Sequence, residues 1–577
     1  MNHQPSIEAI SRPSDDGGPT SIALGVPGGI HHYPSVDGIL QASEIERSLA
    51  ANEPETDVEL HAFPPPQPEL NYSIFTKNEK RFIVFMASMA SFFSPVSSNI
   101  FFPALNTLAL NLHVSDSLIN LTITTYLIFQ GIAPTVTGSY SDVAGRRPAY
   151  LFCFTIYLGA NIGLALQTNY AALLVLRMVQ SSGSSGTIAL ANAVVADIAT
   201  SAERGTYIGY ASAGALLGPA FGPVIGGLLS QFLGWRSIFW FLAIFSGSFF
   251  ILLLIFFPET CRKVVGNGSV PPPNWAGMSL LNYYHLHQQK KANPERDFAA
   301  ERRELASKRP SGIPNPFAAL KIIFEKEAAI LLVFNGLMYA GFYQVTTGIP
   351  SQFKLIYGFN DLQVGLCFIP LGIGSSFAAV TQGWITDWNY KRHAIRHGFP
   401  VTKTRQQDLG KFPIETARLQ VILPMLYLGI AAVIAFGWVL KFQTNLAGPL
   451  VLLFVIGYAV STSFNVISTL MIDIYPDNPA TATAANNLVR CELGAGATAI
   501  LIPMINRIGR GWTYTFVGLV WLIFSPSLFV LMKWGPQWRV ERLARIQRKK
   551  EEEENARRDV TTENGLAAEA GAEDKLS

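Results

Sequence analysis

Long apolar runs are the feature that most constrains the fold of this chain. Twelve runs have about the 20 residues that an α-helix needs to cross the hydrocarbon core of a bilayer. Only 14% of the residues are charged, against about 25% in soluble domains. The sequence therefore predicts an all-α membrane protein with twelve transmembrane helices. We place these at residues 81–104, 117–138, 148–167, 171–196, 206–231, 236–257, 328–352, 362–385, 417–440, 448–472, 481–505 and 512–534.

Polar segments divide the twelve runs into two sets of six. Residues 1–78 are polar and rich in Pro, Gly and Ser, which predicts a disordered tail. A long polar segment at 258–327 separates the sixth and seventh runs, and a charged tail follows at 535–577. We therefore expect an N-terminal six-helix bundle at 79–257 and a C-terminal six-helix bundle at 328–534.

The Lys and Arg residues of the short loops predict the orientation in the membrane. The loop sequences "NTLALNLHVSDS" and "QTNY" carry none, whereas "GRR", "AER", the 258–327 segment and "NYKRHAIRHG" carry several. Because basic loops remain on the cytosolic side, both termini and the 258–327 segment are expected in the cytosol.

A loop sequence recurs at the same place in each half, after the second and after the eighth run. The two copies are "GSYSDVAGRR" and "GWITDWNYKR", which share a glycine, an aspartate and two basic residues at equal spacing. Parallel six-helix repeats with a substrate site between the halves are typical of transporters. The shared positions are Gly138, Asp142, Arg146 and Arg147 in the first copy and Gly383, Asp387, Lys391 and Arg392 in the second.

The first copy predicts a charged latch at cytosolic helix ends. Asp142 can accept hydrogen bonds within its own loop, and Arg146 and Arg147 can reach Asp197 at the end of the fourth run. Cytosolic positive charge alone would explain the two arginines, but not the glycines, which include Gly145, or the aspartate.

The fourth run contains "RMVQSSGSSG", in which Arg177 and Gln180 lie one helical turn apart on one face. A charge inside the hydrocarbon layer is costly and usually faces a cavity or a partner. The alternative is an arginine that extends to the outer interface, because Arg177 lies only a few residues into the run.

The fifth run contains "GALLGPAFGPVIGG", with a glycine at every fourth position and two prolines. Four residues turn a helix by almost a full circle, so the glycines form a smooth stripe against which another helix can pack. The prolines remove amides and permit a bend. Ordinary small-residue packing explains the stripe but not the repeated Gly-Pro pair. The stripe comprises Gly214, Gly218, Gly222 and Gly226, with Pro219 and Pro223.

Together these motifs resemble the major facilitator superfamily and, within it, the twelve-span drug:proton antiporters of fungi. The resemblance covers about residues 75–535, and it departs from the family pattern at Val143 and Ser181. It implies the major facilitator fold, with two parallel six-helix repeats. In this resemblance, "GSYSDVAGRR" is similar to the signature loop of the family and "RMVQSSGSSG" to its fourth-span motif. The fifth-run motif resembles the one that the family associates with antiport rather than uptake.

A proton-coupled transporter needs a group that binds and releases protons. Glu492 is the only carboxylate in the interior of a predicted span, about mid-depth, where burial would tune its protonation. The alternative is a structural ion pair with an arginine of a neighbouring helix. Arg490 is a poor partner for Glu492, because two residues on one helix point about 200° apart.

Several polar residues are candidates for the cavity, namely Asn99, Arg177, Gln180, Gln344, Asn486 and Arg490. Arg177 and Arg490 in one cavity would favour organic anions, whereas a carboxylate with aromatic residues would favour lipophilic cations. Aromatic candidates are Phe101, Phe102, Tyr339, Phe342 and Tyr343. The sequence leaves the charge of the substrate open.

These features predict a proton-coupled exporter of small organic molecules that works by alternating access, with the latch closing the cytosolic side of the outward-facing state. Alternatives are an exporter of an organic acid or secondary metabolite, a nutrient sensor on the same scaffold, and uptake. No histidine lies inside a span and the four cysteines are scattered, so we expect no enzyme, metal site or cofactor. The expected partners are a small-molecule substrate, protons and the lipid bilayer, without nucleic acid. We expect a monomer in the plasma membrane, or alternatively in the vacuolar membrane.

Overall fold

The computed structural model describes residues 72–294, 296–307, 318–396, 398, 412–475 and 479–573. These residues form helices and contain no β-strand. Eight helical segments are long and apolar enough to cross a membrane, one of which, at 481–549, contains two predicted spans. Helices α4, α6 and α7 are also long enough, at 29, 29 and 33 residues, although they are not among the eight. Long helices therefore lie at all twelve predicted positions.

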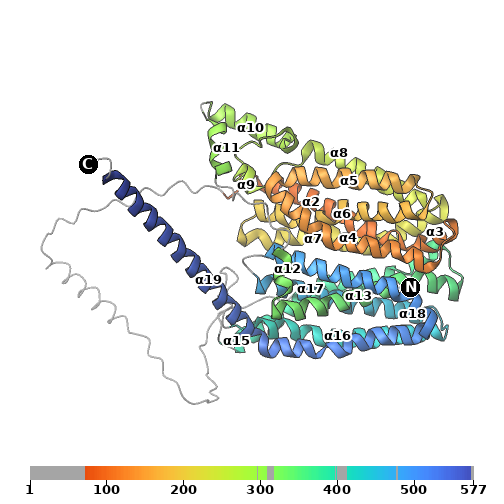
Figure 1. Cartoon of the computed structure of the whole chain (residues 1–577). Coiled ribbons are helices and arrows are strands. Elements are labelled where there is room, and N and C mark those ends of the chain that lie inside the picture. Colours follow the sequence, from red (N-terminus) through yellow and green to blue (C-terminus); the bar gives the residue numbers. More distant parts are fainter. Residues whose placement is uncertain are drawn as a thin grey trace, which may run out of the picture. The chain divides into compact units, whose positions relative to one another are not determined.

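The first half contains six long helices that lie side by side (Figure 1). The outer end of α2 continues through a 3₁₀ turn, η1 (Phe102–Ala104), into α3 (Leu105–Asn111). The six helices are α2 (Lys77–Asn99), α4 (Asp116–Ala144), α5 (Arg146–Leu166), α6 (Tyr170–Ile198), α7 (Ser201–Leu233) and α8 (Arg236–Phe256).

The second half repeats this arrangement. Helix α18 contains a break at Gly509, where φ is 79°, so it comprises the eleventh predicted span and the beginning of the twelfth. Helix α19 completes the twelfth span and continues to Glu573, well beyond the predicted end of the span. The helices are α13 (Lys326–Tyr357), α14 (Asp361–Leu366), α15 (Ile369–Arg396), α16 (Ile414–Lys441), α17 (Ala447–Ile474), α18 (Pro479–Phe524) and α19 (Pro526–Glu573).

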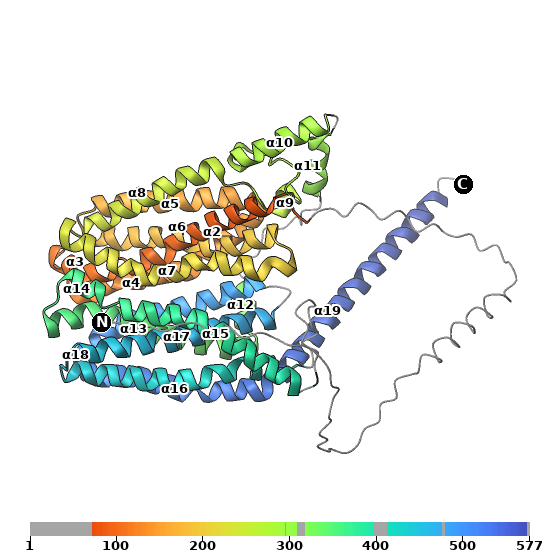
Figure 2. The same ribbon diagram turned by 180° about the vertical axis from the view of Figure 1, so that it is seen from behind.

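The two halves meet along two pairs of helices. Helix α7 packs against α14 and α15, and α4 packs against α18 (Figure 2). Below, the outer end is the end that carries Asp116 and Asp361, and the inner end is the end that carries Arg146 and Asp197, following the predicted topology.

One prediction about a polar segment needs correction within the described residues. Residues 72–78 do not behave as a tail, because Phe75 is buried and the Tyr72 hydroxyl donates to the carbonyl of Ala196 at 3.0 Å. The prediction for residues 1–71 lies outside the described residues. The segment between the halves is partly helical, with α9 (Arg262–Val265), η2 (Trp275–Gly277), α10 (Leu280–Ala292), α11 (Phe298–Ser307) and α12 (Ala318–Ile323).

Two buried ion pairs hold α19 against the inner end of the second half. Arg539 lies 3.0 Å from Glu415 of α16, and Arg542 lies 3.7 Å from Glu327 of α13. All four side chains are at most 5% exposed. Charge buried to this degree requires a partner, so the turns of α19 that carry Arg539 and Arg542 form part of the folded bundle.

Candidate functional site

Arg177 of α6 lies in the centre of the first half and is 1% exposed. Its guanidinium carbon lies 4.3 Å from the ring centres of both Phe101 and Tyr126. Its Nη1 donates to Gln180 Oε1 at 2.6 Å and to the carbonyl of Ser97 at 3.2 Å. Its Nε and Nη2 have no hydrogen-bond partner within the described part of the chain. The arginine therefore does not extend to the outer interface, and part of its hydrogen-bonding capacity is free for a ligand.

Arg490 of α18 has similar surroundings in the second half. Its guanidinium carbon lies 5.0 Å from the ring centre of Tyr339 and 4.6 Å from that of Phe464. Its Nε and Nη2 both donate to Asn487 Oδ1, at 3.1 and 2.8 Å. Among the described residues, no carboxylate lies within ion-pair distance of Arg490 or Arg177. Each half therefore presents one cation between aromatic rings without an acidic partner.

Aromatic residues of α13 connect these two sites. The rings of Tyr339 and Tyr343 lie 4.7 Å apart, and the Tyr343 hydroxyl lies 3.1 Å from Ser98 Oγ of α2. The ring of Phe102 also lies 6.4 Å from that of Tyr343. A continuous series of rings thus leads from the first half to Arg490.

The remaining polar candidates are buried and bonded to nearby groups. Asn99 donates to the carbonyl of Pro95 at 2.7 Å, and Gln344 donates to that of Ala497 at 3.2 Å. Asn486 accepts from Asn335 Nδ2 at 2.6 Å. These bonds fix helix positions and leave the two arginines as the chemically distinctive groups.

Glu492 does not have the buried environment that its mid-span position predicts. Its side chain is exposed on the protein surface beside α4, where a Cβ on Gly131 would lie 3.2 Å from Glu492 Oε1. No ion pair of Glu492 is present among the described residues, so the alternative of a structural ion pair gains no support. Sequence position gives depth along a helix but not which face meets the neighbouring helix.

At the inner end, Arg146 joins the two predicted carboxylates. Its Nε lies 2.8 Å from Asp197 Oδ2, and its Nη1 lies 2.6 Å from Asp142 Oδ1. Asp142 also lies 3.6 Å from Lys263 of α9. The chain turns into α5 at Gly145, where φ is 110°, a conformation that favours glycine. This cluster ties the α4–α5 loop to the end of α6.

Arg147 does not reach Asp197, contrary to the prediction. It donates to the carbonyls of Leu253, Leu254 and Phe257 at the end of α8, at 3.2, 2.6 and 2.5 Å. Carbonyls in the last turn of a helix lack intrahelical partners, although that of Leu253 also accepts the amide of the capping residue Phe257 at 3.1 Å, and a cation complements the helix dipole there.

The sequence reasoning missed Glu259, which lies in "FFPETCRK" directly after the sixth span and is 0% exposed. Its carboxylate accepts the backbone amides of Arg146, Arg147 and Cys261 at 2.8, 3.1 and 2.8 Å. Burial raises the pKa of Glu259, and these amides oppose that shift by stabilising the charged form. A Cβ on Gly145 would overlap this carboxylate. An acidic residue immediately after an apolar run was the available signal.

The second copy of the loop sequence does not form an equivalent latch. Asp387, Lys391 and Arg392 are exposed on α15, and no ion pair of Asp387 is present in the described ranges. Instead, Asp473 at the end of α17 pairs with Arg418 of α16 at 3.1 Å. The repeat is therefore visible in the sequence, but the ion pair of the second half uses a different arginine. A Cβ added at Gly138 or Gly383 would meet no atom within 4 Å, so packing does not require either glycine.

The glycine stripe of α7 lies against α2. A Cβ on Gly214 or Gly226 would overlap the carbonyl oxygens of Ser88 and Ile100. A Cβ on Gly218 would lie 2.6 Å from Pro95 Cβ. The backbones of α2 and α7 therefore approach so closely that these three glycine positions leave no room for a side chain.

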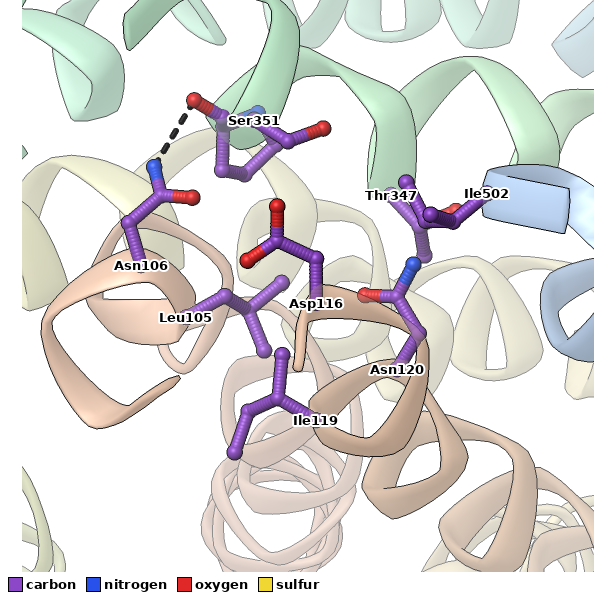
Figure 3. A pocket seen from close by; sticks show the side chains of 9 residues that line it. Leu105, Asn106, Asp116, Ile119, Asn120, Thr347, Ser351 and Ile502 are labelled. Carbon is purple, nitrogen blue, oxygen red and sulfur yellow. Dashed lines mark hydrogen bonds between the residues drawn. The ribbon is translucent and has the colours of Figure 1, made fainter. Parts of the chain in front are cut away.

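At the outer end, a depression of about 1070 Å³ has lining residues from both halves, including Asn106, Asp116, Lys354 and Arg510. A small pocket adjoins it, where Asn106 Nδ2 donates to the carbonyl of Pro350 at 2.8 Å and so joins α3 to α13 (Figure 3).

The fold and these motifs agree with the comparison to known proteins. Residues 87–499 match the model of the Major Facilitator Superfamily. The chain belongs to this superfamily. Members of the superfamily are transporters rather than enzymes, so a small-molecule substrate is implied.

Three relatives illustrate the match. The MFS-type transporter phiD of a fungal species is 49% identical over 470 residues, which cover 82% of this chain and 70% of that protein. The MFS-type transporter tstD of Talaromyces stipitatus is 43% identical, with 83% and 86% covered. Citrate exporter 1 of Aspergillus niger is 37% identical, with 83% and 90% covered.

Among solved structures, a D-xylose-proton symporter is similar, with a TM-score of 0.54 at 16% identity. The similarity covers 77% of this chain and 97% of that structure. At this identity, the likeness concerns the fold alone.

Proposed function

We propose that this transporter is a substrate:proton antiporter that exports small organic molecules from the cytosol, and that its substrates are organic acids. The two halves would rock about the region between them, which exposes the substrate site to each side in turn. The plasma membrane is the expected location and a monomer the expected form, with the vacuolar membrane as the alternative location.

The observation that carries the proposal is the pair of arginines without acidic partners. Arg177 and Arg490 lie in opposite halves, each between two aromatic rings. A guanidinium binds a carboxylate through two parallel hydrogen bonds, and flanking rings offer stacking surface to an unsaturated or aromatic acid. A lipophilic cation would be repelled by both arginines. The name of one relative, Citrate exporter 1, also favours an anionic substrate.

The direction of transport and the coupling to protons rest on other grounds. The Gly-Pro stripe of α7 supports export, through its resemblance to antiporters. Glu492 remains our candidate for the proton carrier. Its side chain lies beside Gly131 at the contact between α4 and α18, so its surroundings change when these helices of opposite halves move relative to each other, which supports a role in coupling.

Mass spectrometry of medium and cytosol tests the substrate class. Cells that express the native chain should enrich carboxylated metabolites in the medium. Arg490→Gln should lower this export by about tenfold or more, because a charged hydrogen-bonded partner of the substrate is lost. Arg392→Gln is the matched control, because Arg392 is exposed on α15 and, within the described ranges, its guanidinium carbon lies over one ring, that of Trp388, at 5.7 Å. Enrichment of cations, or equal export by Arg490→Gln at matched abundance, would contradict the proposal.

The same assay tests the proton carrier. Glu492→Gln should remove the dependence of export on the pH gradient while the protein remains at native abundance. Export that keeps its full pH dependence in this variant would exclude Glu492 from coupling. If the medium is enriched neither by cells with the native chain nor by cells with Glu492→Gln, uptake or sensing would be favoured instead.

A further inference from the structure

Asp361 begins α14 at the outer end, yet its carboxylate is buried, with 8% of the residue exposed. Both of its oxygens accept hydrogen bonds from the opposite half. Thr107 Oγ1 of α3 lies 2.9 Å from Oδ1 and 2.7 Å from Oδ2, and Ser230 Oγ of α7 lies 2.5 Å from Oδ2. One side chain of the second half is thus held by two hydroxyls of the first.

No basic side chain of the described residues neutralises this carboxylate. Within the described ranges, no basic side chain lies within ion-pair distance of Asp361. The elements packed against α14 are α7, η1 and α13, together with α3 through Thr107, and α3 carries no charged residue. η1 carries no charged residue, α7 has its acidic and basic residues, Glu203 and Arg204, at the inner end, and α13 has Lys326 and Glu327 there as well. The charged residue of these elements at the outer end is Lys354, which is exposed.

The position in the first turn of a helix explains only part of this arrangement. An acidic residue there is favoured by the helix dipole, and Asn360 already caps the helix through Gln363. Neither effect requires contact with the other half. A carboxylate that served α14 alone would be expected to face water.

The hydrogen bonds that join the halves lie between mid-depth and the outer end. Besides Asp361, they include the bond from Asn106 to Pro350 and the 2.9 Å contact between Thr124 and Thr498. By contrast, Arg146 at the inner end binds partners within its own half, as does Arg418. The described conformation is therefore tied together at its outer end.

We propose that Asp361 is the outer latch of the transport cycle. Its carboxylate holds the outer ends of the two halves together while it accepts hydrogen bonds from Thr107 and Ser230, and the outer ends separate when these bonds break. This inference builds on the alternating access of the proposed function.

Distances between spin labels on the purified full-length protein test the latch without any substrate. Leu110 of α3 and Leu355 of α13 line the outer depression from opposite halves and are 66% and 72% exposed. Cysteines at these two positions can be labelled selectively, because the four native cysteines are buried. Pulsed EPR then reports how far the outer ends separate.

Asp361→Asn should raise the ratio of separated to closed conformers by at least about tenfold, the effect of losing one hydrogen bond to a charged group. Thr107→Val combined with Ser230→Ala should produce the same shift. Because this double variant leaves Asp361 and the rest of α14 unchanged, it separates the loss of the hydrogen bonds from any damage to α14. Asp116→Asn is the control, because Asp116 lines the same depression and has no ion pair or side-chain hydrogen bond across the halves among the described residues.

Unchanged distances in both Asp361→Asn and the double hydroxyl variant would overturn the latch. Because the distances need no substrate, a failure of the export experiment would leave this result interpretable, and the reverse also holds.

Discussion

The contact between α7 and α2 predicts a specific cost for one added methyl group. In Gly218→Ala, the new Cβ would lie 2.6 Å from Pro95 Cβ and 2.9 Å from the backbone nitrogen of Val96. Ordinary van der Waals contact begins near 3.4 Å, so the two helices must separate by about 0.8 Å, from 3.4 − 2.6. A gap of this size forfeits about a quarter to a half of the dispersion energy of the contacts it opens.

Gly209→Ala is the matched control, because it lies in the same helix and a Cβ there would meet no atom within 4 Å. Both substitutions gain about 1 kcal/mol of helix propensity relative to glycine. Their difference in the free energy of unfolding therefore isolates the overpacking, for which we expect about 1–3 kcal/mol. Unfolding of the purified protein by SDS in mixed micelles measures this difference. A Gly218→Ala protein as stable as Gly209→Ala would refute the close approach of α7 to α2.

Two further predictions concern the inner end. Asp142→Asn should slow transport at near-normal surface expression, because an exposed ion pair contributes only about 0–1 kcal/mol to stability; loss of expression would instead indicate a folding role. Burial raises the pKa of Glu259 above the value of about 4.3 that a glutamate has in the unfolded state. At pH values between these two pKa values, the folded state binds more protons than the unfolded state. The free energy of unfolding should therefore fall as the pH rises through that window. Thermal unfolding of the native protein and Glu259→Gln across this range checks the sign, and an identical slope in both would contradict it.

Most of the architecture follows from periodic features of the sequence. Runs of about 20 apolar residues define helices because lipid leaves no other way to satisfy the backbone. The spacing of the α7 glycines predicts a smooth face, and the spacing of Arg490 and Glu492 predicts that these side chains point apart. Each of these inferences depends on geometry within a single helix.

The sequence could not give the partners that helices acquire in three dimensions. Glu259 lies in a segment that has the composition of a polar linker, yet it accepts the backbone amides of Arg146 and Arg147. Arg147 donates to carbonyls at the end of α8, and no pattern of side chains in the sequence predicts bonds to backbone carbonyls. Asp387 repeats the position of Asp142, yet it lies on an exposed face because the second half pairs Asp473 with Arg418. Glu492 has the predicted depth but faces the surface, since rotation about the helix axis is set by packing.

Arg539 and Arg542 of α19 make part of the C-terminal segment necessary for the charge balance of the second half. Chain cleavage before Arg539 would leave Glu415 and Glu327 buried at the inner ends of α16 and α13 with no counter-charge. Losing one member of a buried pair typically costs about 3–5 kcal/mol. Any event that pulls on or modifies the turns of α19 that carry Arg539 and Arg542 therefore acts directly on the helices of the second half.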